Sequence, residues 1–143
     1  MPIALAEVRD APVDAPELSA LVARPDAGAV VAFVGVVRDH DPQASGTVVS
    51  LNYTCHPSAP QLIAEIVADV LAEIDPEGTC LVAAVHRIGH LSVGDNAFVV
   101  AVSAAHRRPA FDVCEQVVEQ VKARLPVWKQ QFEADGSFRW SGL

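Results

Sequence analysis

The sequence has few of the residues that commonly mark a metal, disulfide or nucleotide site. Its three cysteines, Cys55, Cys80 and Cys114, are odd in number and form no CxxC pair, which argues against a disulfide framework and a zinc site. The five histidines show no HExxH or other tight ligand spacing, so we expect no metal ion. Neither GxGxxG nor GxxxxGK[ST] occurs, so no nucleotide cofactor is indicated.

Long apolar runs and a basic surface are also missing. The longest apolar run, residues 28–37, is about half as long as a membrane-spanning helix. The first residues lack the basic and apolar regions of a signal peptide. A formal net charge of −8 argues against nucleic acid or an acidic membrane as the main partner, because both require a broad basic face. The sequence therefore predicts a cytoplasmic protein that binds neither nucleic acid nor membrane.

Lysine is scarce in a chain that uses arginine freely. Lys122 and Lys129 are the two lysines among ten cationic residues. The lysine amine is a compact charge whose pKa falls readily on burial, whereas arginine stays protonated and planar. Two lysines seven positions apart therefore suggest a need for an amine, although exposed lysines without a special role are the commonest kind.

The spacing of apolar residues predicts an α+β fold with a mixed, mainly antiparallel sheet and two main helices, in a single domain over residues 1–143. Residues 29–37 are almost wholly apolar and predict a buried strand, and residues 89–94 predict a turn. A short helix follows Asp14, a longer one is expected to be capped by Ser58, and a third begins near Pro109 with Phe111 on its apolar face. The other strands are expected at residues 3–8, 47–53, 80–85, 96–104, 127–132 and 138–140.

Basic residues gather just beyond the ends of predicted strands. Arg38 follows one strand, His86 and Arg87 follow another, and His106 and Arg107 stand between a third strand and a helix. A helix N-terminus with adjacent Arg and His favours an anion. These groups meet only if their strands point the same way, since an antiparallel neighbour ends at the opposite edge. Ordinary solvated arginines, a hydrogen-bonded structural His86 and an exposed His40 are the alternative interpretations.

Four segments, taken together, resemble a known family. In their order and spacing they are similar to the large, catalytic subunit of molybdopterin synthase, the MoaE family, over about residues 28–140. The resemblance implies the MoaE-like α/β hammerhead fold. The segments are GAVVAFVGVVRDH at 28–40, VHRIGHLSVGD at 85–95, VSAAHR with Ala110-Phe111 at 102–111, and KARLPVWK at 122–129.

The resemblance also implies an activity and its partners. Such enzymes transfer sulfur from a ubiquitin-like small subunit, which carries a C-terminal Gly-Gly thiocarboxylate, to cyclic pyranopterin monophosphate. The product is the molybdopterin dithiolene of molybdenum cofactor biosynthesis. The large subunits form a homodimer within a heterotetramer, and the small subunit's tail enters a pocket of the large one.

By the same resemblance, Lys122 and Lys129 are the catalytic residues, and Arg38, His106 and Arg107 bind the pterin phosphate. Arginine offers fork geometry to oxyanions, and a lysine suits an acyl oxyanion or a proton transfer. Because the nucleophilic sulfur arrives on the partner, the enzyme needs no catalytic cysteine, metal or cofactor of its own.

The sequence departs from the family pattern at several positions. Gln130 and Gln131 follow Lys129 where relatives commonly have a basic residue and then Glu, and Thr54 and Ala59 replace a common Glu and Met. The chain ends three residues after Trp140, which leaves open any contact made by a longer tail. Two other functions therefore stay open: a non-catalytic homologue that binds a pterin or a ubiquitin-like tail, and an unrelated anion-binding α+β domain.

Overall fold

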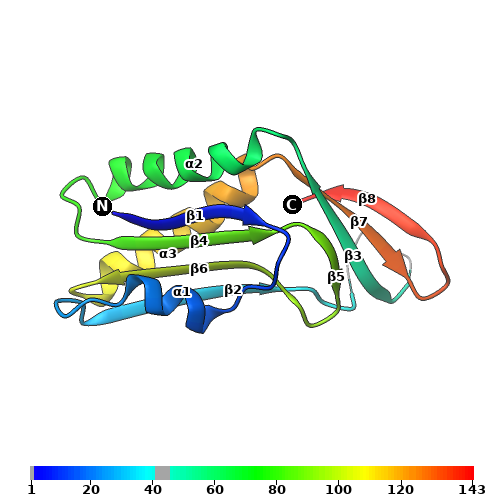
Figure 1. Ribbon diagram of the computed structural model, residues 1–143, viewed down its shortest axis with the longest axis horizontal. Helices are drawn as coiled ribbons and strands as arrows, with labels where there is room; N and C mark the ends of the chain where they lie inside the picture. Colours follow the sequence, from blue (N-terminus) through cyan, green and yellow to red (C-terminus); the bar gives the residue numbers. More distant parts are fainter. Residues whose placement is uncertain (1, 41–45) are drawn as a thin grey trace.

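The structure, a computed structural model, describes residues 2–40 and 46–143. Helices and strands are mixed along the chain, and the predicted α+β fold is confirmed (Figure 1). The elements are β1 (Ile3–Arg9), α1 (Ala15–Val22), β2 (Ala29–Val36), β3 (Val48–Cys55), α2 (Ala59–Ile74), β4 (Leu81–Arg87), β5 (Gly89–Ser92), β6 (Asn96–Ala104), α3 (Arg107–Arg124), β7 (Val127–Glu133) and β8 (Phe138–Gly142).

The strands form two four-stranded sheets. The first has the order β1-β4-β6-β2, and only its β1–β4 pair is parallel among the described strands. The second has the order β5-β3-β7-β8 and is antiparallel. In Figure 1 the second sheet lies at the right, where the arrows of β2 and β4 point, whereas the arrow of β6 points away from it. The predominance of antiparallel pairs is as predicted.

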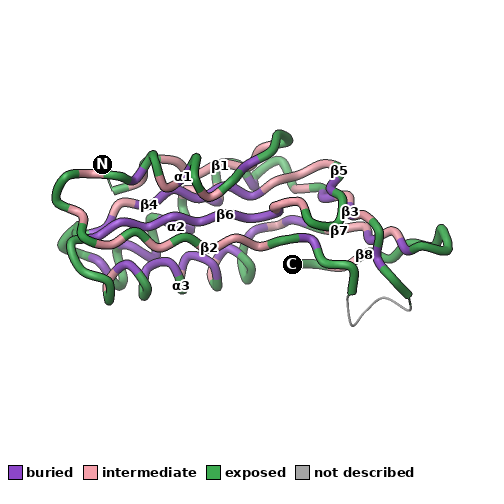
Figure 2. The backbone as a smooth tube through the Cα atoms, turned by 90° about the horizontal axis from the view of Figure 1, so that it is seen from below, coloured by how far each residue is buried: buried purple, intermediate pink, exposed green. Residues whose placement is uncertain are grey.

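Helices cover both faces of the first sheet. α2 and α3 pack on one face, over a large apolar core, and α1 packs on the other, over a smaller one. β6 lies between these layers and is buried along nearly its whole length (Figure 2). A strand buried on both faces reads as a continuous apolar run rather than an alternating one, which is the pattern of residues 97–102. No helix among the described residues is long and apolar enough to cross a membrane.

Three expectations about burial and strand positions were wrong. β2 is the outer strand of its sheet rather than a buried one, and Val30 and Val36 are 48% and 52% exposed. Phe111 is 52% exposed and lies outside the core. Gly89–Ser92 is strand β5, paired with β3, and not part of a turn. Apolar composition identifies a strand or a helix, but it does not say whether another element covers each face.

Helix α1 has a side-chain cap at its start, whereas α2 and α3 have none. The Glu17 amide donates to Asp14 Oδ1 at 2.8 Å, so α1 is capped as predicted. The Ser58 side chain does not cap α2; its hydroxyl lies 2.8 Å from His56 Nδ1 instead. α3 begins at Arg107, before Pro109, because His106 takes the extended N-cap conformation and proline fits a first helical turn.

His86 is the structural histidine that its position suggested. It is buried, and its Nδ1–H donates to the Arg87 carbonyl oxygen at 2.7 Å. The ring stacks on Phe98 with centroids 5.4 Å apart and meets Tyr53 edge-on at 5.2 Å. Burial lowers the pKa of His86 to about 4, with a smaller contribution in the same direction from the Lys122 charge. His86 is therefore neutral at pH 7 and packs as an aromatic residue.

The lowered pKa of His86 predicts how stability depends on pH. Between pH 6.5 and 4 the unfolded chain binds a proton that the folded chain does not, so the free energy of unfolding should fall as the pH falls through this window. The full effect is about 3 kcal/mol. His86→Gln should flatten this part of the stability curve, because glutamine does not titrate. Denaturant unfolding at pH 4.5 and pH 8 measures how far the free energy of unfolding changes between the two pH values. An equal change in the wild type and in His86→Gln would contradict the assignment.

Candidate active site

The pairing of the strands decides which strand-end residues meet. β2 and β4 both run antiparallel to β6, so Arg38 lies at the edge of the sheet where β4 also ends. His106 follows β6 and therefore lies at the opposite edge. Helix α3 then returns along the sheet from His106, and its last turn carries Lys122. The fold thus brings Lys122 back to the edge where Arg38 stands.

A pocket of about 210 Å³ opens at this edge. Three of the five predicted site residues line it: Arg38, Lys122 and Lys129. The pocket lies where the end of β2, the last turn of α3 and strands β3 and β7 come together. Its lining residues are Gly35, Val36, Val37, Arg38, His40, Leu51, Tyr53, Lys122, Lys129 and Gln131.

The register of the second sheet fixes one wall of the pocket. In the antiparallel pair of β3 and β7, Tyr53 stands opposite Lys129 and Leu51 opposite Gln131. Residues two apart on a strand share a face, so these four side chains point to the same side. Pro126 separates α3 from β7 because it cannot continue the helix. This short connection places the two lysines on different walls of one pocket.

The pocket is electrostatically suited to anions. Arg38, Lys122 and Lys129 carry positive charge, and none of its described lining residues is an aspartate or glutamate. Lys122 and Arg124 occupy the last turn of α3, where the negative end of the helix dipole stabilises cations. Lys122 and Arg38 are exposed in the free chain, and Lys129 is partly so. An anion can therefore reach all three cations from solvent.

His106 and Arg107 do not line this pocket. They stand at the N-terminus of α3, exposed to solvent, and Arg107 lies fifteen residues before Lys122. At a rise of 1.5 Å per residue, Arg107 and Lys122 are separated by about 22 Å along the helix. Within one chain the predicted site residues thus form two groups, one at each end of α3.

His40, Tyr53 and Gln131 line the pocket but were not among the predicted site residues. His40 was expected to be an exposed loop residue, and it is exposed, but it also lines the pocket. The strand alternation contained a usable signal, because Gln131 lies two residues after Lys129 and so shares its face. Only the pairing with β3 adds Tyr53 and Leu51 to that face.

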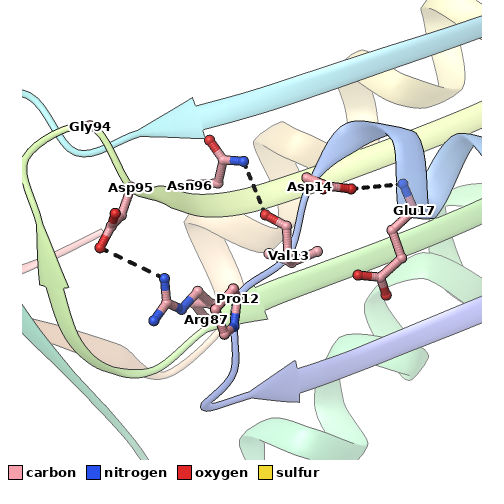
Figure 3. Close-up of a pocket in the computed structure, with 8 residues that line it drawn as sticks. All are labelled: Pro12, Val13, Asp14, Glu17, Arg87, Gly94, Asp95 and Asn96. Atoms are coloured by element: carbon pink, nitrogen blue, oxygen red, sulfur yellow. Dashed lines mark hydrogen bonds and ion pairs between the residues drawn. The ribbon is translucent and has the colours of Figure 1, made fainter.

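A larger pocket, of about 410 Å³, lies on the α1 side of the first sheet (Figure 3). Its polar groups serve the fold. Asp14 caps α1, Asn96 Nδ2 donates to the Val13 carbonyl oxygen at 3.0 Å, and Arg87 pairs with Asp95 at 3.9 Å. None of the predicted site residues lines it. The smaller, cationic pocket is therefore the better candidate for chemistry.

The cysteines lie outside the cationic pocket. Cys114 is buried in the core, as predicted, and burial raises the pKa of its thiol to about 11. Burial also raises the pKa of Cys80. Cys55 is partly exposed on β3 and does not line the pocket. A reactive thiol needs a lowered pKa and access to solvent, so neither Cys80 nor Cys114 suits a nucleophile.

Comparison with known proteins places these features in a family. The profile of the family described as "MoaE protein" matches residues 8–124. Molybdopterin synthase catalytic subunit 1 of Mycobacterium tuberculosis is 37% identical over 133 residues, which are 93% of this chain and 87% of that protein. The crystal structure of molybdopterin synthase from Staphylococcus aureus superposes with a TM-score of 0.82 at 27% identity, covering 96% of this chain and 97% of the other.

A further structure shares the fold at lower identity. It is described as a protein–protein complex of subunits 1 and 2 of molybdopterin-converting factor from Helicobacter pylori. The TM-score is 0.64 at 19% identity, and the match covers 81% of this chain and 73% of the other.

Proposed function

The chain belongs to the MoaE protein family, and we propose that it is the catalytic subunit of a molybdopterin synthase. In the proposed reaction, sulfur passes from a thiocarboxylated, ubiquitin-like small subunit to cyclic pyranopterin monophosphate and forms the molybdopterin dithiolene. The observation that carries this proposal is the convergence of Lys122, Lys129 and Arg38 on one pocket. Both reactants are anions, and each can be held there by a cation.

The sulfur enters on the partner, so the pocket has to stabilise charge rather than supply a nucleophile. In each of the two sulfur transfers, the thiocarboxylate sulfur attacks a side-chain carbon of the pterin, and a C–O bond of that carbon breaks with its oxygen taking up a proton as it leaves. A thioester then links the tail to the substrate. Water adds to the thioester carbonyl, the C–S bond breaks, and the tail leaves as a carboxylate while the sulfur stays on the pterin. Lys122 and Lys129 stabilise the oxyanion of this addition, which is where a preorganised charge lowers the barrier most. Arg38 holds the phosphate by its fork of donors.

His106 and Arg107 serve the same pocket if they come from a second copy of the chain. β2 is the outer strand of its sheet, and Val30 and Val36 are exposed on it. If two β2 strands pair antiparallel across a two-fold axis, the start of one lies beside the end of the other. Ala29 stands opposite Ala104 and Val36 opposite Asn96. The partner's residues 106–107 are thereby brought towards this chain's Arg38.

The proposed assembly is a homodimer of this chain that binds two small subunits, in the cytoplasm. Dimer pairing along β2 leaves the second sheet and its pocket free at each end for a small subunit. The tail of that subunit ends in Gly-Gly, and glycine lets a backbone pass through a narrow opening.

Mixed dimers test the cross-subunit arrangement. Arg107→Ala and Lys122→Ala should each inactivate a homodimer, whereas a mixed dimer keeps one intact site, built from Lys122 of one copy and Arg107 of the other. Random mixing of the two variants should therefore restore roughly a quarter of the wild-type rate. Molybdopterin formation after co-refolding measures it. A mixture no more active than its components would place both residues in the same chain's site.

Reconstitution tests the activity itself. The purified chain, a thiocarboxylated carrier and the cyclic precursor should together yield molybdopterin. Binding of the carrier and the precursor without any product would instead support the non-catalytic homologue.

No cysteine of this chain is needed in the proposed reaction. Cys55→Ser should therefore keep the wild-type rate, and so should the variant with all three cysteines replaced by Ser or Ala. Some stability should be lost at Cys114, because truncation of a buried side chain leaves a cavity. Thermal unfolding separates that loss from activity. A well-folded Cys55→Ser protein without activity would show that the nucleophile has been misassigned.

A further inference from the structure

Arg38 reaches the cationic pocket from a segment that belongs to neither a helix nor a strand. It stands two residues beyond the end of β2, is exposed, and its guanidinium makes no hydrogen bond or ion pair with any residue in the described part of the chain. Because no neighbouring side chain holds the guanidinium, the backbone decides where it can reach. On one side that backbone is tied to the start of β3, since the Val48 amide donates to the Asp39 carbonyl oxygen at 2.9 Å.

On the other side of Arg38 the backbone is held by the β5–β6 turn, residues 92–95. The Val37 amide donates to the Asp95 carbonyl oxygen at 2.9 Å, and the Gly94 amide donates to the Val37 carbonyl oxygen at 2.8 Å. Val37 is buried, so water competes little for these two bonds. A residue bonded through both its amide and its carbonyl has little freedom, and Arg38 is the next residue along the chain.

The β5–β6 turn is itself closed by hydrogen bonds and by a glycine. The Ser92 amide donates to Asp95 Oδ2 at 2.9 Å, and the Asp95 amide donates to the Ser92 carbonyl oxygen at 3.0 Å. Arg87 Nη1 lies 3.9 Å from the same carboxylate oxygen (Figure 3). Gly94 has a φ of +93°, and a Cβ added there would meet no atom within 4 Å. The backbone conformation, and not a lack of space, therefore calls for glycine here.

The same turn joins the two sheets beside the pocket. β5 pairs with β3, where Ser92 stands opposite Ser50, and β6 begins directly after the turn. β3 carries Leu51 and Tyr53, which line the pocket together with Arg38. The turn therefore fixes the end of β2, which presents Arg38, relative to the wall that β3 forms.

We propose that Gly94 and Asp95 are positioning residues for Arg38. By holding Val37, they fix the Arg38 backbone at the place from which the guanidinium binds the phosphate of the substrate. The proposal rests on the proposed function, which gives Arg38 its ligand. It also gives a role to residues 85–95, which form one of the four family segments although none of them lines the pocket. An arginine whose backbone is fixed in advance loses less freedom on binding, which raises affinity.

Inorganic phosphate tests this proposal without the sulfur carrier. The two lysines of the chain both line the pocket, so the two Cε signals of ¹³C-labelled lysine can follow a phosphate titration of the intact protein. Gly94→Ala should weaken phosphate binding about fivefold or more, because alanine avoids a positive φ and the turn then releases Val37. Gly94→Asn should restore part of the affinity, since asparagine tolerates positive φ better than alanine does.

Gly78→Ala is the matched control. Gly78 also has a positive φ, +70°, and a Cβ added there would likewise meet nothing within 4 Å. It lies in the loop before β4, at the opposite edge of the sheet from the pocket. The backbone strain is of the same kind, but phosphate affinity should stay within about twofold of wild type, because distant sites act independently.

A double-mutant cycle separates positioning from a purely structural role. Arg38→Ala should itself weaken phosphate binding about tenfold, since it removes a charge-assisted hydrogen bond. Adding Gly94→Ala to that variant should change the affinity by less than about twofold, because no guanidinium is left to position. Hydrogen exchange gives a second readout: in Gly94→Ala the Val37 amide should exchange faster while the amides of β6 keep their protection.

Any of five results would overturn the proposal: no phosphate binding to the wild type, equal affinities for Gly94→Ala and Gly78→Ala, a loss with Gly94→Asn as large as with Gly94→Ala, the same loss with and without Arg38, or unchanged exchange of the Val37 amide. If Gly94→Ala does not fold, Asp95→Ala opens the turn by removing its bond to Ser92, and it should also weaken phosphate binding. Loss of that negative charge would by itself favour an anion, so an unchanged or higher affinity would overturn the proposal too.

The phosphate titration and the reconstitution of molybdopterin synthesis fail separately. A reconstitution without product refutes the proposed function and leaves the positioning of Arg38 standing. Normal product formation by a Gly94→Ala protein of unchanged phosphate affinity refutes the positioning and leaves the proposed function standing.

Discussion

Replacing Lys122 with alanine is expected to lower the rate of molybdopterin formation by a factor of about 100 to 1,000 while leaving the fold intact. The loss follows from its position in the last turn of α3, where it lines the same pocket as Lys129. In the proposed reaction it stabilises the oxyanion formed when the thioester is hydrolysed. Alanine is the best helix former and Lys122 is exposed, so the helix should not be destabilised. Single-turnover kinetics with thiocarboxylated carrier measure the effect.

Two further variants show whether the amine itself is needed. Lys122→Arg should also fail, because a planar fork replaces neither a compact ammonium nor a group that exchanges a proton at neutral pH. Arg124→Ala is the matched control, since Arg124 lies in the same helical turn but pairs with Asp69 at 2.9 Å outside the pocket. It should keep the wild-type rate, because exposed ion pairs contribute little. A Lys122→Ala protein of near-normal activity would exclude the catalytic role.

Removing the terminal Gly-Gly from the small subunit is expected to abolish sulfur transfer while weakening its association with this chain only modestly. In the proposed mechanism the tail carries the reacting sulfur into the pocket, so its loss should remove the chemistry outright. Most of the affinity is expected from apolar contacts of the globular part, whereas the buried charges are expected to fix position and specificity. Calorimetric binding of intact and truncated carrier, measured beside the sulfuration assay, separates the two effects.

Removing both lysines from this chain should have the same effect as truncating the carrier: association is kept and sulfur transfer is lost. A Lys122→Ala, Lys129→Ala double variant should assemble with the intact carrier and remain inactive. Two results would refute the proposed mechanism: unchanged sulfur transfer with the truncated carrier, or no binding of the intact carrier at micromolar concentration.

The sequence by itself determined the local structure and the family. The one-faced apolar stripe of α2 and the uninterrupted apolar run of β6 both indicate burial, and both elements formed as predicted. The four ordered segments identified the relatives that the comparisons then found. The scarcity of lysine suggested a need for an amine, because an amine and a guanidinium serve different chemistry, and the family resemblance then singled out Lys122 and Lys129.

Only the tertiary structure decided which of these residues share a site. Periodicity shows which side chains lie on the apolar face of a helix or strand. It does not show which strand packs beside that element or in which direction that strand runs. Antiparallel pairing of β2 and β6 put Arg38 and His106 at opposite edges, and the return of α3 carried Lys122 back to Arg38. The pairing of β7 with β3 and β8 placed Gln131 in the pocket. These arrangements depend on contacts between segments far apart in the chain, which no local pattern encodes.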